Sequence, residues 1–449
     1  MRVVTIGTGY VGINTAVALS YVGHSVVGVD VDEAKVALLK SRRAPISEAG
    51  LDELLAIDDR ISFTSDLGSC IGDADVVFIA VGTPSAANGE ADISYVLSAA
   101  DEIGRLLTPT HDVTIVVKST VPVGVNAMIA RQIRGAVGAR GGDVSHLHFA
   151  SNPEFLREGC ALHDTFYPDR FVIGTEDEKA YSMLCELFEP ILMQTFEPPQ
   201  AVESPEQRTL PQCLHTDQVS AEMVKYASNV FLALKISYAN EIAGLCEKIG
   251  ANMSDVSRGM GMDKRIAPAF LRSGLGWGGS CFPKDSKALL HMAQDYSYPM
   301  PIVTAAVEVN SRQKDRLILK LLDHLHVLVG QRIAVLGLSF KPRTNDVRNS
   351  PSVDVADILV QRGARVRVHD PKGLENARHI YAENGFEFFD TAEEAVRGVD
   401  AIVIATEWDD YKSLDWAEIR RNMAGSLLLD ARNLLRGTGV EQLFDYCGL

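Results

Sequence analysis

Short apolar runs alternate with amphipathic stretches along most of the chain, and they fall into two series. The first series predicts strands at 2–6, 25–30, 74–81, 113–118 and 147–151. The second predicts strands, some with the turn that follows, at 333–338, 365–369, 401–405 and 427–433. Strands that alternate with helical stretches are typical of an α/β protein with parallel sheets. We therefore expect two Rossmann-like, doubly wound domains.

Between the two series, apolar residues at helical spacing predict one long helix at about 218–249, ended by Gly250. A helix this long typically bridges domains or packs against a partner subunit, so we expect a homodimer or a larger homo-oligomer. Residues 197–217 are rich in Pro, Gln, Glu and Thr and are predicted to form a loop or linker. The predicted domains are a Rossmann domain at 1–200, a central helical dimerisation region at 201–320 and a second Rossmann-like domain at 321–449.

Composition narrows the class of protein. The 449 residues are 46% hydrophobic and 23% charged, as in an ordinary soluble enzyme, and the net charge is −16. That charge argues against a non-specific nucleic-acid-binding protein, although a local pocket of Arg and Lys would still bind an anionic small molecule. The seven cysteines are scattered without a CxxC pair, so neither a disulfide framework nor a zinc site is expected. We expect no membrane span and no signal peptide, and hence a cytoplasmic location.

The first predicted strand leads into Gly7-Thr8-Gly9-Tyr10-Val11-Gly12, and a helix and a second strand ending in Asp30 follow. This is the dinucleotide-binding fingerprint in its required context. Gly7 allows the tight turn, Gly9 lets a pyrophosphate approach the helix N-terminus, and Gly12 lets the helix pack on the strand. Asp30 is expected to bind the ribose hydroxyls and to repel a 2′-phosphate. We therefore predict NAD, rather than NADP, as the cofactor.

Two later strands end in loops that suit close contact with a ligand, because ligands bind at the carboxyl ends of strands in open α/β sheets. These loops are Val81–Pro84 and Lys118–Gly124. Thr83 and Thr120 are therefore candidates to contact the cofactor. The alternative for each threonine is a turn or a helix cap.

The segment Asn152–Gly159 carries two glutamates four residues apart, Glu154 and Glu158. On a helix they would share one face, and their repulsion would raise the pKa of one of them unless Arg157 or a substrate intervened. A raised pKa suits a general base. A solvated first helical turn explains the same pattern equally well.

The chain is organised around Gly276–Asp285, where three glycines in four residues precede Cys281. Backbone without side chains lets a ligand approach closely. If a helix starts at Cys281, Lys284 would favour its thiolate, and Asp285 would act as a base or hold a water. The alternative is a turn that ends in a buried, inert cysteine.

Two further groups of polar residues are candidates. Lys225 and Asn229 lie four apart on the long helix, although an exposed lysine is the simpler interpretation of Lys225. The loop 340–351 carries three cations, which suits a phosphate-bearing ligand. The second α/β unit lacks GxGxxG, so a mononucleotide is more natural there than a second dinucleotide.

With these motifs in this order, the chain resembles the UDP-glucose/GDP-mannose dehydrogenase family over nearly its whole length. The motifs that carry the resemblance are Gly7–Gly12, Val81–Pro84, Lys118–Gly124, Asn152–Gly159, Lys225 with Asn229, Gly278–Asp285 and Phe340–Pro351. The resemblance implies a dinucleotide-binding N-terminal domain, a central dimerisation region and a nucleotide-binding C-terminal domain. It also implies that two NAD oxidise a sugar C6 alcohol to an acid, through a thiohemiacetal and a thioester on Cys281.

Within that family we expect the substrate to be UDP-glucose and the product to be UDP-glucuronate. The segment Phe282–Asp285 favours this sugar over the UDP-N-acetylhexosamines. Oxidation of GDP-mannose or of a UDP-N-acetylhexosamine is the alternative. A catalytically silent nucleotide-sugar-binding protein is a more remote one.

The resemblance further implies roles for individual residues. Those that match catalytic positions are Cys281, Lys225, Asn229, Asp285, Glu154 and Thr120. Those that match cofactor contacts are Gly7, Gly9, Tyr10, Val11, Gly12, Asp30, Lys35, Thr83, Thr120, Glu158, Lys284 and Arg348. Those that match substrate contacts are Glu154, Phe155, Leu156, Arg157, Glu158, Lys225, Asn229, Arg265, Gly278, Phe340, Lys341 and Arg432. Arg265 is expected to reach a neighbouring subunit, and no metal is expected.

Overall fold

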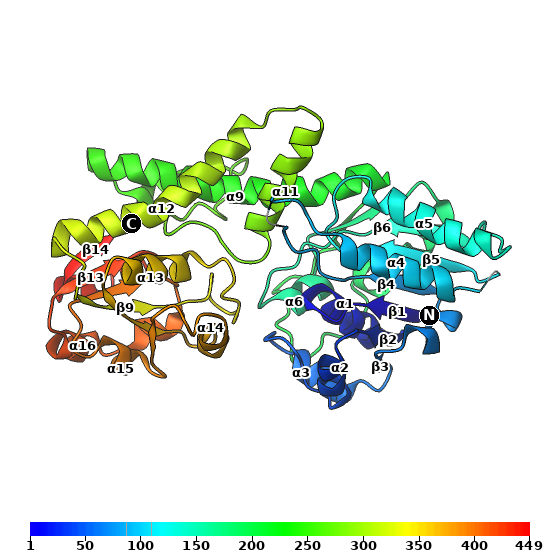
Figure 1. Cartoon of the computed structure of the whole chain (residues 1–449), viewed down its shortest axis with the longest axis horizontal. Coiled ribbons are helices and arrows are strands. Elements are labelled where there is room, and N and C mark those ends of the chain that lie inside the picture. Colours follow the sequence, from blue (N-terminus) through cyan, green and yellow to red (C-terminus); the bar gives the residue numbers. More distant parts are fainter. Residues whose placement is uncertain (87, 109) are drawn as a thin grey trace. The chain divides into compact units, whose positions relative to one another are not determined.

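The structure is a computed structural model that describes residues 1–86, 88–108 and 110–449. It divides into two compact units, Met1–Ala227 and Ser228–Leu449. Figure 1 shows a sheet flanked by helices in each of them. None of the helices in the described part of the chain is both long and apolar enough to cross a membrane.

The first unit contains an eight-stranded sheet in the order β3-β2-β1-β4-β5-β6-β7-β8. The strands are β1 (Arg2–Ile6), β2 (Ser25–Val29), β3 (Ile61–Thr64), β4 (Val76–Ile79), β5 (Val113–Val117), β6 (Leu147–Ser151), β7 (Arg170–Gly174) and β8 (Gln212–Thr216). All neighbours pair in parallel except β6 and β7, which are antiparallel. The order 3-2-1-4-5-6 of the first six strands is that of a doubly wound dinucleotide-binding fold, which confirms the predicted class.

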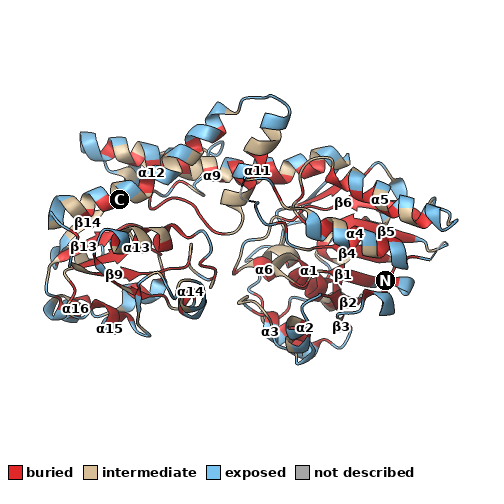
Figure 2. Cartoon of the chain, viewed as in Figure 1, coloured by how far each residue is buried: buried red, intermediate tan, exposed pale blue. Residues whose placement is uncertain are grey.

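Helices cover both faces of this sheet. They are α1 (Tyr10–Tyr21), α2 (Glu33–Lys40), α3 (Leu51–Ile57), α4 (Ser94–Leu106), α5 (Val125–Ala139), α6 (Ala161–Phe166), α7 (Glu178–Leu187) and α8 (Glu189–Leu192). Alternate residues of β4 belong to two different cores: Val76 and Phe78 pack with α1, α3 and α7, and Val77 and Ile79 pack with α4 and α5. The central strands are therefore buried while the outer helix faces remain exposed (Figure 2).

The second unit contains a six-stranded, fully parallel sheet in the order β11-β10-β9-β12-β13-β14. Its strands are β9 (Arg332–Leu336), β10 (Arg365–His369), β11 (Glu387–Phe388), β12 (Ala401–Ile404), β13 (Leu427–Asp430) and β14 (Asp445–Gly448). Its helices are α10 (Met253–Gly261), α11 (Phe282–Asp295), α12 (Pro301–Leu325), α13 (Pro351–Gln361), α14 (Leu374–Ile380), α15 (Ala392–Val396) and α16 (Trp416–Asn422). This sheet is wound in the same order as the first, so the prediction of two doubly wound sheets is confirmed.

The long helix predicted between the sheets is α9 (Gln218–Ile249), with 32 residues. Asp217 caps its start, since its carboxylate accepts a hydrogen bond from the Ser220 N–H at 2.8 Å. Gly250 follows its end with φ +77°, a left-handed conformation that glycine adopts without strain.

The segment 197–217 was expected to be a loop, and this prediction is wrong for its last part. Residues Gln212–Thr216 form β8, which pairs in parallel with β7 at the edge of the sheet. Four of its five side chains are exposed, so the strand has neither an apolar run nor a clear alternation by which the sequence could have revealed it.

Candidate active site

The glycine fingerprint forms the turn between β1 and α1. Gly7 has φ +92°, and a Cβ there would lie 2.7 Å from the Ala80 carbonyl oxygen. A Cβ at Gly12 would collide with the Gly7 carbonyl oxygen, whereas a Cβ at Gly9 would meet nothing within 4 Å. The chain itself therefore requires glycine at two positions, and the third leaves open backbone at a helix N-terminus, which fits a pyrophosphate.

Asp30 ends β2 beside this turn and is buried. Its Oδ2 accepts hydrogen bonds from the Thr8 N–H and Thr8 hydroxyl, both at 2.8 Å, and from Lys35 Nζ at 2.9 Å; its Oδ1 accepts one from the Asp32 N–H at 3.1 Å. Burial raises the pKa of Asp30, but these hydrogen bonds more than offset it and the net pKa is lowered. Asp30 is thus a carboxylate at neutral pH, and Lys35 lies against it.

The Tyr10 hydroxyl joins two loops within the unit, and the predicted contact of Tyr10 with the cofactor stays a prediction. Its hydroxyl donates to Glu48 Oε2 and accepts from the Gly159 N–H, each at 2.5 Å. Glu48 also accepts from the Gly159 and Leu162 N–H groups at 3.0 and 3.4 Å, and its burial raises its pKa. Sequence reasoning missed Glu48, because it is one acid in a polar loop with no motif around it. Val11 follows Tyr10 on α1 and is half-buried.

Thr83 and Thr120 are brought together by the loops after β4 and β5. The Thr83 hydroxyl donates to the Thr120 carbonyl oxygen at 2.8 Å. Thr83 is buried and Thr120 is half-buried. This hydrogen bond fixes the two loops to each other, and cofactor contact by either residue stays a prediction.

The segment Asn152–Gly159 is not helical, so the expectation that Glu154 and Glu158 share a helix face is wrong. Pro153 has no N–H to donate to a helix, and the Glu154 carboxylate accepts a hydrogen bond from the Leu156 N–H at 2.5 Å. Gly159 ends the segment with φ +80°. Local side-chain hydrogen bonding therefore takes the place of a helical turn.

Glu154 forms a buried ion pair with Lys225, with 2.7 Å between Oε1 and Nζ. Burial raises the pKa of Glu154, but the charge and hydrogen bond of Lys225, with the Leu156 N–H and the charge of Lys118, lower it overall. The pKa rise expected for one of the two glutamates therefore does not occur at Glu154, because cations surround this carboxylate. Lys225 is buried rather than exposed.

The remaining residues of the segment have separate partners. Arg157 pairs with Asp164 at 2.5 Å, so it is not the cation that neutralises Glu154. The Phe155 ring lies 3.8 Å from the Arg170 guanidinium carbon, measured to the ring centroid. Leu156 is half-buried.

In the second unit, Cys281 is the N-cap residue of α11. This position favours a thiolate, because the N–H groups of a helix N-terminus stabilise negative charge. The Ser280 hydroxyl lies 3.5 Å from its sulfur. Cys281 is half-buried, which contradicts the alternative of a fully buried thiol.

Asp285 lies one turn into α11 and is buried. Its carboxylate accepts hydrogen bonds from Asn229 Nδ2 and from Lys284 Nζ, each at 2.6 Å. The Lys284 ammonium binds the adjacent Asp285; its expected effect on the thiolate of Cys281 stays a prediction. The structure thus brings three predicted residues together around one carboxylate.

The glycines before Cys281 are explained by their neighbours. A Cβ at Gly279, which has φ +81°, would lie 2.8 Å from the Phe340 ring, and a Cβ at Gly278 would collide with the Asn349 carbonyl oxygen. Asn310 of α12 binds the backbone of Trp277 twice, accepting from its N–H at 2.8 Å and donating to its carbonyl at 2.9 Å. Sequence reasoning missed Asn310, which lies 33 residues from the backbone it holds.

Basic residues predicted to contact substrate or cofactor have distinct surroundings. Arg432 follows β13, donates through Nε to the Ala405 carbonyl at 2.8 Å, and has a buried Nη2 without a hydrogen-bond partner among the described residues. Such a nitrogen suits an anionic oxygen of a ligand.

The other basic residues have partners within the chain. Lys341 lies over the Phe340 ring. The Arg348 guanidinium binds Asp346, and Arg265 is exposed and pairs with Asp263.

Asp370, which follows β10, corresponds in position to Asp30 but has different surroundings. Its carboxylate accepts six hydrogen bonds, from the N–H groups of Leu338, Ser339, Lys372 and Gly373, the Ser339 hydroxyl and Trp408 Nε1. A carboxylate has about four lone-pair positions. It is therefore saturated, which agrees with the prediction that this unit binds no second dinucleotide.

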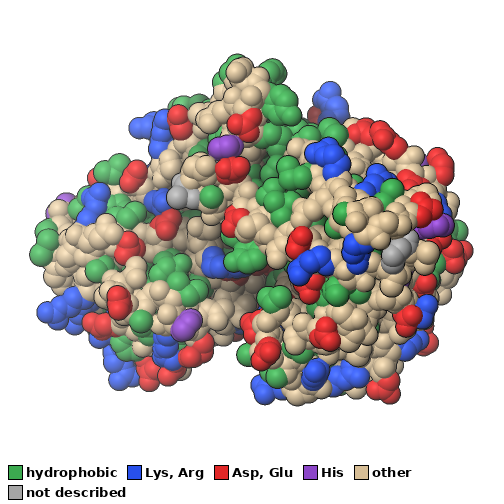
Figure 3. Space-filling model, turned by 45° about the vertical axis from the view of Figure 1, so that its right-hand side comes forward, with side chains coloured by type: hydrophobic (Ala, Val, Ile, Leu, Met, Phe, Trp, Pro, Cys, Tyr) green, Lys and Arg blue, Asp and Glu red, His purple; other side chains and the backbone are tan. Residues whose placement is uncertain are grey.

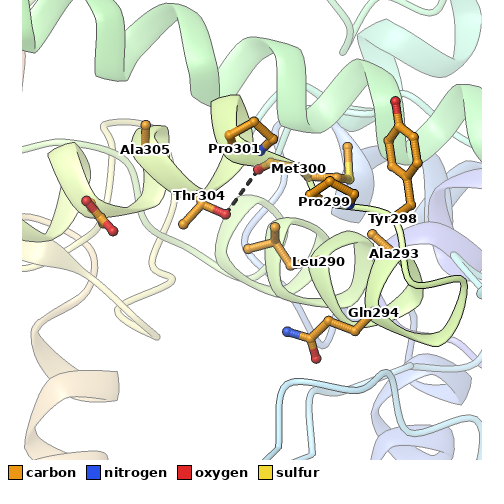
Figure 4. A pocket seen from close by; sticks show the side chains of 10 residues that line it. Leu290, Ala293, Gln294, Tyr298, Pro299, Met300, Pro301, Thr304 and Ala305 are labelled. Atoms are coloured by element: carbon orange, nitrogen blue, oxygen red, sulfur yellow. Dashed lines mark hydrogen bonds between the residues drawn. The ribbon is translucent and has the colours of Figure 1, made fainter.

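A cavity of about 400 Å³ lies between α11 and α12 (Figure 4). Its lining is mostly apolar and includes Leu290, Pro299, Met300 and Pro301. None of the predicted site residues lines it. We therefore do not assign it to the active site.

Three models of the UDP-glucose/GDP-mannose dehydrogenase family match the chain: the NAD binding domain at residues 1–192, the central domain at 219–312 and the UDP binding domain at 334–437. The chain is 42% identical to the UDP-glucose 6-dehydrogenase YwqF of Bacillus subtilis (strain 168), covering 96% of this chain and 93% of that protein. It belongs to this family. The predicted family and the prediction of NAD as the cofactor are therefore confirmed.

Other members of the family match along the whole chain. The UDP-glucose 6-dehydrogenase of Rhizobium meliloti (strain 1021) is 43% identical over 98% of this chain and 97% of that protein. A solved structure of a UDP-glucose dehydrogenase from Pyrobaculum islandicum is 38% identical, with a TM-score of 0.85 and coverage of 97% and 95%. A UDP-D-ManNAc dehydrogenase from Pyrococcus horikoshii is 26% identical, with a TM-score of 0.83 and coverage of 100% and 99%.

Proposed function

We propose that this chain is an NAD-dependent dehydrogenase that oxidises UDP-glucose to UDP-glucuronate, with two NAD reduced for each acid formed. The observation that carries the proposal is Cys281 at the N-terminus of α11, in a chain 42–43% identical over nearly its whole length to two UDP-glucose 6-dehydrogenases. The open backbone at Gly9 and the charged Asp30 fit NAD. When bound, NAD accepts a hydride from the substrate carbon.

Cys281 divides the oxidation into two steps. After the alcohol has become an aldehyde, the thiolate adds to the carbonyl carbon and the oxygen takes up a proton, which gives a thiohemiacetal. This carbon can then lose a second hydride while its hydroxyl group loses a proton, which leaves a thioester. Water then attacks the thioester, the C–S bond breaks, and the acid and the free thiol of Cys281 result.

The buried polar groups supply proton transfer and charge stabilisation. Glu154, held as a carboxylate, is proposed to act as the base around the thioester stage. Lys225 and Asn229 are proposed to stabilise charge on the reacting oxygen, and Asp285 to hold the attacking water. Thr120 is also proposed to be a catalytic residue, because it matches a catalytic position of the family.

The C-terminal unit is proposed to bind the UDP part of the substrate. Arg432 supports this, because its buried Nη2 is available to a phosphate oxygen. Phe340, Lys341 and the bare backbone of Gly278 are proposed further contacts, and Arg265 is proposed to act from a neighbouring copy. The exposure of Arg265 leaves its guanidinium able to do so.

We propose that the copies associate through the central region 201–320. Phe231, Tyr238 and Leu245 of α9 recur every seven residues, and their exposed fractions are 63%, 48% and 54%. Residues seven apart lie on one helix face, so they form an apolar stripe suited to a second copy. On the face of the protein that Figure 3 shows, acidic and basic side chains are interspersed.

A cytoplasmic setting is proposed for the reaction. All seven cysteines are free thiols. Reduced sulfur is typical of intracellular proteins, and the proposed chemistry requires Cys281 in this form.

The deciding experiment measures NADH absorbance with UDP-glucose, GDP-mannose and UDP-N-acetylhexosamines in turn. We expect UDP-glucose to be preferred and two NADH to form per acid.

Cys281→Ala should keep the fold but lose turnover by about 10³-fold or more, since the second oxidation has no thiol adduct. Glu154→Gln should accumulate a covalent adduct on Cys281, visible as a mass increase. Near-normal acid formation by Cys281→Ala would refute the thioester route, and preference for another sugar would correct the substrate.

A further inference from the structure

Lys118 is a buried lysine that the proposed reaction does not yet use. It directly follows β5, and its Nζ donates a hydrogen bond to Asn152 Oδ1 at 2.8 Å. Asn152 is itself fixed, because its N–H donates to the Val117 carbonyl at 3.0 Å and its Nδ2 donates to the Val172 carbonyl at 2.8 Å. The ammonium is thus held at the carboxyl ends of β5 and β6, and Asn152 is fixed to the middle of β7.

The surroundings of the Lys118 ammonium disfavour its charged form. In the described part of the chain, no carboxylate lies within 4.0 Å of Lys118 Nζ, and its hydrogen-bond acceptor is a neutral amide. The Phe188 ring centroid lies 6.0 Å away. Burial lowers the pKa of Lys118 to about 8, with a smaller lowering by Lys225 that the charge of Glu154 opposes. A methionine of similar length would avoid this desolvation cost, so the packing alone does not explain the lysine.

The charge of Lys118 acts on the proposed catalytic base. Asn152, which holds Lys118, is two residues before Glu154, and Glu154 forms the 2.7 Å ion pair with Lys225. Lys118 interacts electrostatically with both members of that pair, and its charge favours the carboxylate of Glu154. The buried carboxylate of Glu154 is therefore in contact with one buried cation, Lys225, and interacts electrostatically with a second, Lys118.

We propose that Lys118 is a positioning residue that keeps Glu154 ionised and limits the positive charge that Lys225 can retain. This inference rests on the proposed function, in which Glu154 is a base. Loss of the Lys118 charge favours the protonated form of Glu154, and it also favours the protonated form of Lys225. Both effects move titrations in the same direction, toward higher pH.

The test compares the pH profiles of kcat for the parent enzyme, Lys118→Met, Lys118→Arg and the control Lys179→Met. Lys179 lies in the same unit, is half-exposed and pairs with Asp112, away from Glu154. The acidic and alkaline limits are the pH values at which kcat falls to half its maximum. In Lys118→Met we expect both limits to move up by roughly one pH unit. Lys118→Arg keeps the charge and should keep both limits near those of the parent, as should Lys179→Met. A uniform fall in rate with unmoved limits would indicate a structural role and overturn the proposal.

A second measurement is independent of catalysis. Carbon NMR of protein labelled at glutamate carboxyl groups, with Glu154 assigned by its absence in Glu154→Gln, follows the titration of this group directly. Its midpoint should rise in Lys118→Met; Lys118→Gln, which is neutral but can still donate to Asn152, replaces it if the methionine variant does not fold. An unchanged midpoint would refute the proposal. If no sugar nucleotide is oxidised by the parent while the midpoint still rises, the proposed function fails and the electrostatic role of Lys118 stands.

Discussion

At the residue scale, the buried pair of Glu154 and Lys225 leads to a prediction about stability. Glu154→Gln would leave Lys225 and Lys118 buried without their carboxylate, so we expect a loss of about 3–5 kcal/mol near pH 7. Glu154→Gln/Lys225→Met should lose less, because one of the two cations goes with the carboxylate. Urea unfolding of the parent and both variants measures this, and an equal loss in both variants would contradict it.

The pH dependence of that loss has a definite sign. The pKa of Glu154 is lowered in the folded protein, so its contribution to stability is present above the unfolded pKa of about 4.3 and is lost as pH falls through the folded pKa. We therefore expect the difference between the parent and Glu154→Gln to shrink on acidification. A difference that does not change with pH would mean that Glu154 is not charged in the folded state.

Asp30 leads to a prediction about cofactor choice. Its lowered pKa keeps it negative at working pH, where it would repel a 2′-phosphate. Asp30→Ser should raise the ratio of kcat/KM for NADP over NAD by about tenfold or more, because a like charge near a phosphate costs over 1 kcal/mol. It should also lower activity with NAD. Asp66→Ser, which removes an exposed acid in the same unit, serves as the control, and an unchanged ratio in Asp30→Ser would refute the role.

Single residues were predictable from sequence where a motif surrounds them, as for Gly7, Asp30 and Cys281. Glu48 and Asn310 were not, because each acts on the backbone of a segment far along the chain: Glu48 on Gly159, 111 residues away. No local pattern records such a contact.

At the scale of elements, the glycine-rich segment before α11 can be tested by a matched pair of substitutions. Gly279 and Gly330 both have positive φ, +81° and +77°, but a Cβ meets the Phe340 ring at the first and nothing within 4 Å at the second. Gly330→Ala should cost about 1–2 kcal/mol for backbone strain alone. Gly279→Ala should cost at least about 1 kcal/mol more and reduce turnover, because the segment leads to Cys281. Urea midpoints and kcat measure both, and equal stability costs would show that Phe340 yields without penalty.

Elements were predictable where hydrophobic periodicity is strong. The length of α9 and the central strands of both sheets follow from it. The non-helical course of 152–159 did not, because the hydrogen bond that the Leu156 N–H donates to the Glu154 carboxylate competes with the helical turn that the charge spacing predicted. The strand β8 was missed for the opposite reason, since its exposed edge position leaves no apolar signal.

At the scale of the whole molecule, the apolar stripe on α9 predicts an oligomer. Phe231→Ser/Tyr238→Ser/Leu245→Ser should shift the protein toward the monomer in analytical ultracentrifugation, because it removes exposed apolar area that a second copy would bury. Ile57→Ser/Tyr95→Ser, which changes exposed apolar residues on α3 and α4, should leave the mass unchanged. A parent protein that is active as a monomer would contradict the proposal.

The repeated winding of the two sheets has a consequence for engineering. In both sheets an aspartate follows the second strand. The Oδ1 atom of Asp30 accepts a hydrogen bond from the Asp32 N–H, whereas each carboxylate oxygen of Asp370 already accepts three hydrogen bonds. Grafting a glycine fingerprint after β9 would therefore not create a second dinucleotide site. A designer would first have to release Asp370 from Trp408 and from the turns on either side, and then stabilise those turns in another way.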